Sequence, residues 1–69
     1  MQPDAQHIGD AIALVALEII VAVSPDNEAA AAALDDVAGK LLDAVRGLQP
    51  GPTHDIITAT AEILVKSEV

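Results

Sequence analysis

The residues of this chain that could do chemistry are two histidines, each with a carboxylate nearby. His7 lies three residues before Asp10, and His54 is followed directly by Asp55. Such a pair can act as a general base, or can hold zinc if further ligands approach. Neither pair has the H-x-x-x-H spacing that places two ligands on one helix face, and nothing in the sequence supplies a third ligand. We therefore predict no metal site and no cofactor, and expect both histidines to be exposed near helix ends.

The hydroxyl groups do not form a catalytic arrangement either. A nucleophile requires an activating base held beside it. Thr53 and His54 are neighbours, but adjacent residues of a helix point in different directions. Capping and local backbone hydrogen bonds account for the positions of all five hydroxyls, which belong to Ser24, Thr53, Thr58, Thr60 and Ser67. We expect that the protein is not an enzyme, since a chain this short encloses no substrate pocket of the usual size by itself.

Acyl and peptidyl carrier proteins are similarly short, acidic and helical, and carry their prosthetic group on the serine of an Asp-Ser-Leu motif at a helix start. This chain contains no Asp-Ser pair, and Ser24-Pro25-Asp26 has the reverse order. The sequence is therefore not that of a carrier protein.

Proline and glycine clusters divide the chain into three helical segments of one small domain. Pro25 lacks an amide donor and disfavours a helical Ser24, which predicts a first helix over residues 6–23. Ser24, or else Asp26 or Asn27, caps a second helix over 28–48. A linker over 49–53 follows, with Thr53 as the predicted N-cap of a third helix over 54–67. That last segment is rich in β-branched residues, which leaves a strand as the alternative.

The second predicted helix has one apolar and one charged face. Its acidic residues include Asp35, Asp36 and Asp43, which lie opposite the apolar positions. We interpret these three as a candidate surface for a basic partner, against the simpler alternative of a solvated face.

The first predicted helix is apolar on more than one side. Residues 11–23 read AIALVALEIIVAV, interrupted only by Glu18. We expect one stripe to pack in the core, made of Ile8, Ile12, Val15, Ile19 and Val23. We expect a second stripe to form an oligomer interface, made of Leu14, Leu17 and Val21, with Asp10 and Glu18 at its rim.

Composition limits the classes of partner. Three Lys and Arg residues against eleven Asp and Glu give a formal net charge of -8, which disfavours direct binding to nucleic acid or to an anionic membrane. Residues 11–23 are too short and too acidic for a membrane span, and residues 1–10 lack the basic residues of a secretory signal. We therefore expect a cytoplasmic protein. No cysteine or aromatic residue is present, so the core is thin and oligomerisation is the expected supplement.

These observations predict an all-α fold, a helical hairpin plus a third helix, assembled as a homodimer or higher oligomer into a helical bundle. The function that we expect is a non-enzymatic interaction with another protein, as a small regulator, adaptor or inhibitor. An acidic nucleic-acid mimic that blocks a DNA- or RNA-binding protein is the alternative. The sequence also leaves open that a different protein, rather than a second copy, covers the first helix.

Overall fold

The computed structural model describes residues 4–67, which form three helices and no strand. They are α1 (Ala5–Val23), α2 (Asn27–Val45) and α3 (Pro52–Lys66). The predicted all-α class is confirmed. The β-branched third segment is a helix, because its buried residues, among them Ala61 and Leu64, recur with helical spacing and form one face against the core.

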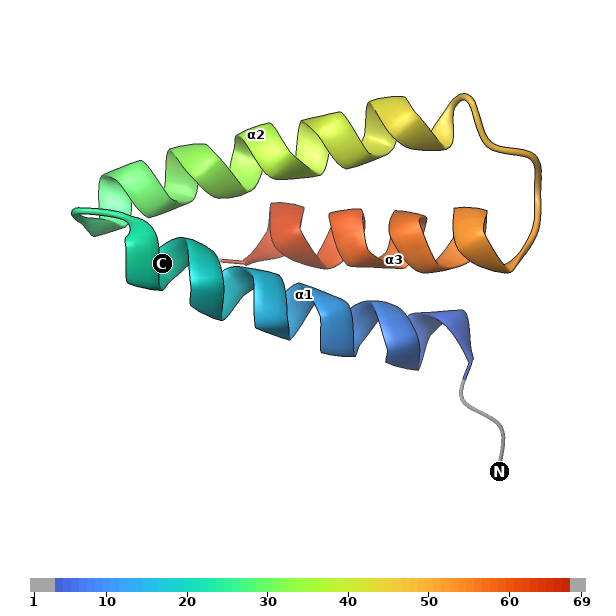
Figure 1. Cartoon of the computed structure of the whole chain (residues 1–69), viewed down its shortest axis with the longest axis horizontal. Helices are drawn as coiled ribbons and strands as arrows, with labels where there is room; N and C mark the ends of the chain where they lie inside the picture. The colour runs from blue at the N-terminus through green and yellow to red at the C-terminus, as the bar shows by residue number, and fades with distance from the viewer. Residues whose placement is uncertain (1–3, 68–69) are drawn as a thin grey trace.

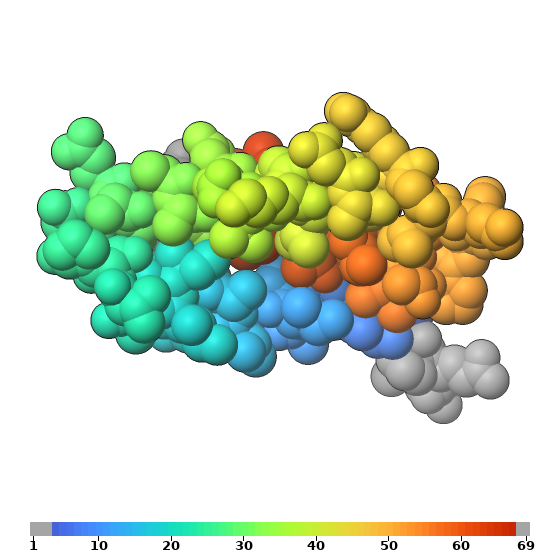
Figure 2. Space-filling view, turned by 45° about the horizontal axis from the view of Figure 1, so that its top comes forward, coloured from blue at the N-terminus to red at the C-terminus, as the bar shows by residue number. Residues whose placement is uncertain are grey.

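α1 and α2 are joined by a short turn at 24–26 and diverge from it, while α3 lies between them (Figure 1). α3 packs extensively against both neighbours, whereas α1 and α2 touch each other little. The principal extents of 36 × 29 × 16 Å describe a flat molecule. The space-filling view shows α1 and α2 as its two long edges, with α3 visible between them (Figure 2). Among residues 4–67, α3 is therefore the main packing neighbour of α1.

A carboxylate caps the N-terminus of each of the first two helices. The Asp4 side chain accepts a hydrogen bond from the His7 amide at 2.9 Å, and that of Asp26 accepts one from the Ala29 amide at 2.8 Å. Of the predicted alternatives, Asp26 is thus the cap of α2, and the Ser24 hydroxyl instead donates to the Ile20 carbonyl. Each carboxylate satisfies an amide that has no partner within its own helix.

Two helix boundaries differ from the prediction. α3 starts at Pro52, so the prediction of Thr53 as its N-cap is wrong: Gly51 stands at the cap without a side-chain bond. Proline suits the first helical position, because it needs no amide donor there and its φ is already helical. α2 ends at Val45 rather than at residue 48, and the Gly47 amide donates to the Ala44 carbonyl at 3.1 Å in the tightened last turn.

The core is small and rich in alanine. Its buried members are Ala13, Leu34, Ala38 and Leu64, with Ala16, Leu17, Ile20, Val37, Leu41 and Ile63 packed against them. Leu34 and Leu64 are the largest fully buried side chains. Because alanine buries little area, the chain gains less from this core than a leucine-rich core would provide.

The prediction of which α1 residues face the core is wrong. Gly9 and Ala13 are the buried residues of α1, whereas Ile12, Val15 and Ile19 are exposed. The reason is the close approach of α1 to α3 at Gly9. A Cβ added to Gly9 would lie 2.6 Å from Ala59 Cβ and 3.0 Å from the Thr60 nitrogen. Only small residues fit at this point of the crossing, so Ile12, Val15 and Ile19 lie outside it, whereas Leu17 and Ile20 pack against the core further along α1.

Two glycine substitutions test this crossing. Gly9→Ala should destabilise the protein by about 1–3 kcal/mol, because the added methyl group meets Ala59 and forces the helices apart. Gly39→Ala is the matched control: Gly39 lies inside α2 with open space around it, and alanine there should stabilise by about 0.5–1 kcal/mol. Urea unfolding followed by circular dichroism at 222 nm measures both. A stabilising Gly9→Ala would contradict the close crossing.

Candidate interaction surface

The exposed large apolar side chains of the described residues concentrate on α1. Six of the nine belong to this helix: Ile12, Leu14, Val15, Ile19, Val21 and Val23. Val15 and Leu14 are each 59% exposed, and Val23 is 77% exposed. A helix of a soluble monomer normally turns its large apolar residues inward. In α1 the fully buried residues are Gly9 and Ala13, Leu17 and Ile20 are half-buried against the core, and the six residues named above are exposed.

These side chains fall into two groups around the helix. Ile8, Ile12, Val15 and Ile19 lie within an arc of about 60° at 3.6 residues per turn, and we call these four residues the apolar seam. Ile8 is half-buried and the other three are exposed. Ala22 and Val23 lie at its borders, so no charged residue interrupts it. The seam is the largest continuous apolar surface of α1.

The predicted interface stripe does not form one surface. Leu14 and Val21 are exposed, about 140° around the helix from the seam, and Asp10 and Glu18 lie on either side of them. Leu17 is half-buried and packs against the core. Leu17 therefore supports the fold of the single chain. Leu14 and Val21 share one exposed side of α1 between Asp10 and Glu18, and the interface predicted there stays a prediction.

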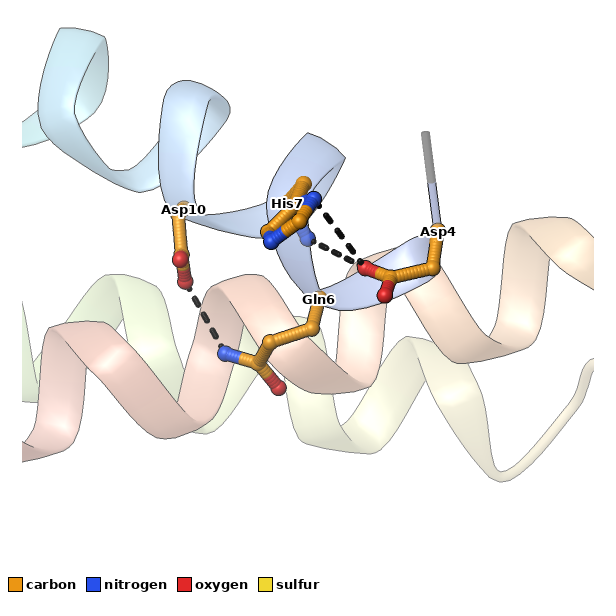
Figure 3. Close-up of polar contacts among 4 residues, drawn as sticks. All are labelled: Asp4, Gln6, His7 and Asp10. Atoms are coloured by element: carbon orange, nitrogen blue, oxygen red, sulfur yellow. Dashed lines mark hydrogen bonds and ion pairs between the residues drawn. The ribbon is translucent and has the colours of Figure 1, made fainter. Parts of the chain in front are cut away.

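The histidines have local partners. His7 Nδ1 lies 3.8 Å from Asp4 Oδ1, while Asp10 accepts a hydrogen bond from Gln6 Nε2 at 2.9 Å, so the predicted neighbours His7 and Asp10 are not paired (Figure 3). His54 Nδ1 lies 3.2 Å from Asp55 Oδ1. Within residues 4–67, no group of three or more His, Cys, Asp or Glu residues could hold a metal ion.

The acidic surface of α2 is partly neutralised by its own cations. Asp35, Asp36 and Asp43 are all exposed, as predicted from the helical pattern. Lys40 Nζ lies 3.0 Å from Asp36 Oδ2, and Arg46 Nη1 lies 3.4 Å from Asp43 Oδ1. These exposed pairs contribute little to stability, but they reduce the negative potential that this face presents to a partner.

A shallow groove lies between α2 and α3, open to solvent. It has a volume of about 520 Å³ and is lined by Leu42, Glu62, Val65 and Lys66. Its two polar residues are a carboxylate and an ammonium group on one helix, four residues apart, and both are exposed. The groove holds no buried polar group that would orient a ligand.

α1 is long and apolar enough to cross a membrane by length and composition. Its 19 residues exceed the 13-residue stretch on which the expectation of a segment too short to span was based. Core helices of soluble proteins pass the same test, but they are mostly buried, whereas 11% of the apolar window of α1 is buried. Signal sequences also pass it, so the finding assigns no location.

Comparison with protein families, with curated proteins and with solved structures found no match to this chain.

Two leucines of α1 distinguish the core side from the solvent side. Leu17→Ala should lower the free energy of unfolding by about 1–2 kcal/mol, because part of its side chain packs against the core. Leu14→Ala should change it by less than about 0.5 kcal/mol, because Leu14 is exposed. Urea unfolding of dilute protein gives both values. Equal losses would show that α1 is rotated from the orientation described.

Folding should not depend on a metal. The carboxylate and histidine groups of the described residues form no ligand cluster, so a strong chelator should leave the thermal midpoint unchanged within about 1 °C. A drop of several degrees, restored by added zinc, would contradict this expectation.

Proposed function

We propose that this chain is a non-enzymatic protein interaction module, a small acidic regulator, adaptor or inhibitor that works by occupying a protein surface and that assembles with itself. The observation that carries the proposal is the apolar seam, an uncharged row of large side chains on an exposed helix. Soluble proteins rarely leave a continuous apolar patch uncovered, and such patches are typical of interaction surfaces.

The packing of α1 supports this proposal, because small residues face α3 while large apolar residues face solvent. Gly9 and Ala13 form the contact with α3, so the seam is not needed to hold the helix in place. The side chains of the seam neither fill the core nor increase solubility. A second surface that covers them would account for their presence.

The hydroxyl groups support a binding role over a catalytic one. The hydroxyls of Ser24, Thr58, Thr60 and Ser67 each donate to the carbonyl four residues earlier, at 2.6 to 2.9 Å. A hydroxyl committed to its own helix is a poor nucleophile, because a base must take the same proton.

The charge distribution indicates how a partner is approached. With a net charge of -8, encounter with a basic protein surface is accelerated, while direct binding to nucleic acid is disfavoured. The ion pairs of Asp36 and Asp43 do not favour the nucleic-acid mimic, which needs a dense array of free carboxylates. We therefore propose protein binding through the seam, in the cytoplasm, as the function.

Matched substitutions test the proposal, because Val15 and Leu14 are equally exposed on different sides of α1. Val15→Asp should remove captured partners from an affinity pull-down in the native host, since it places an unpaired charge in the contact. Leu14→Asp should leave the same partners bound. Circular dichroism of both variants confirms that they fold. If the two variants capture the same proteins as the unmodified chain, the seam is not the surface that binds those proteins.

A further inference from the structure

We propose that the occupant of the apolar seam is a second copy of this chain, packed antiparallel about a two-fold axis. In this dimer, Ile8 faces Ile19 of the second copy, and Ile12 faces Val15 of the second copy. The inference rests on the proposed function, and it names the partner and the orientation.

The spacing of the seam is that of a coiled-coil contact. Ile8, Ile12, Val15 and Ile19 are separated by four, three and four residues, the alternation of the a and d positions of a heptad. Read from the other end, the separations are again four, three and four. In an antiparallel pair, each of the four side chains therefore lies level with a large side chain of the other helix, which gives four successive layers.

Charge favours a copy of the same chain over a basic protein as the occupant. Two chains of net charge -8 repel each other, and a surface that carries no charge adds no local repulsion to their contact. The seam is such a surface, and a two-fold contact requires the same patch to be complementary to itself. A basic partner would instead be matched by carboxylates within the contact, and the nearest, Glu18, lies beyond the seam's edge.

The exposed area agrees with a weak dimer. The seam is one helix face of four side chains, three of them 46 to 59% exposed, so a contact between two copies lies near the lower limit for specific interfaces, on the order of 1,000 Å². We therefore expect dissociation constants in the micromolar range rather than a permanent dimer.

Helix ends decide the orientation. α1 carries a carboxylate at its N-terminal cap and has no basic residue in its last turn. A parallel pair would bring two negative C-terminal ends together and would set Asp4, Glu18 and Asp26 level with their own copies. An antiparallel pair places each C-terminal end beside an N-terminal end and staggers the carboxylates.

Single cysteines map the contact without interference, because the chain contains none of its own. Ile8→Cys and ¹⁵N-labelled Ile19→Cys are mixed in a glutathione redox buffer, and intact mass identifies the disulfides. The two positions are about 16 Å apart along one helix, so antiparallel pairing gives mostly the mixed disulfide and parallel pairing mostly the two homodisulfides. Leu14→Cys, on the other side of α1, is the control and should cross-link poorly.

Sedimentation velocity with interference optics measures the dimer directly, since the chain has no aromatic absorbance. The unmodified chain should form dimers that tighten several-fold from about 50 to 500 mM salt, because salt screens the repulsion between the copies. Val15→Asp should be monomeric. Leu14→Asp, the control, should dimerise as the unmodified chain does.

Four results would overturn the inference: homodisulfides in excess, mixed and homodisulfides in statistical proportion, efficient cross-linking of Leu14→Cys, or a monomer at millimolar concentration. A monomer that binds neutral phosphatidylcholine vesicles through Val15 would identify lipid as the occupant instead. A monomer whose host partners are lost in Val15→Asp would refute the second copy and leave the proposed function standing. A monomer whose host capture is also unchanged by Val15→Asp would refute the proposed function itself.

Discussion

The structure depends on the close crossing of α1 and α3 at Gly9. A side chain as small as alanine at this position would already collide with Ala59. The two helices can approach because Gly9 has a hydrogen atom where other residues have a Cβ. At the same crossing, the Thr60 hydroxyl donates to the Ile56 carbonyl at 2.8 Å and lies 3.5 Å from the Gly9 carbonyl oxygen. Close approach compensates for small side chains, since it brings the backbones themselves into van der Waals contact.

This crossing determines which side of α1 faces solvent. Once Gly9 and Ala13 face inward, the 3.6-residue repeat places Ile12, Val15 and Ile19 on a side that no element of the described chain covers. The apolar seam is therefore a consequence of how α1 packs, and the proposed interaction follows from the same constraint as the fold.

The polar groups are satisfied locally, which leaves the apolar surface to carry recognition. Asp4 and Asp26 cap helices, and the hydroxyls of Ser24, Thr58, Thr60 and Ser67 donate to carbonyls of the preceding turn. No buried side-chain nitrogen or oxygen of the described residues lacks a hydrogen-bond partner. Charge then acts at long range, through solubility and the rate of encounter, rather than through fixed contacts.

The sequence by itself determined the three helices, because Pro25 and the Pro50–Pro52 region cannot continue a helix and the intervening residues repeat with helical spacing. It also determined the exposed carboxylates Asp35, Asp36 and Asp43. Only the tertiary structure decided which side of α1 is buried. Hydrophobic periodicity assigns the stripe of isoleucine and valine residues to the core, whereas the residues of α1 that are buried at its crossing with α3 are Gly9 and Ala13. The distance between α1 and α3 is a property of two helices far apart in the sequence, so no local pattern in α1 reveals it.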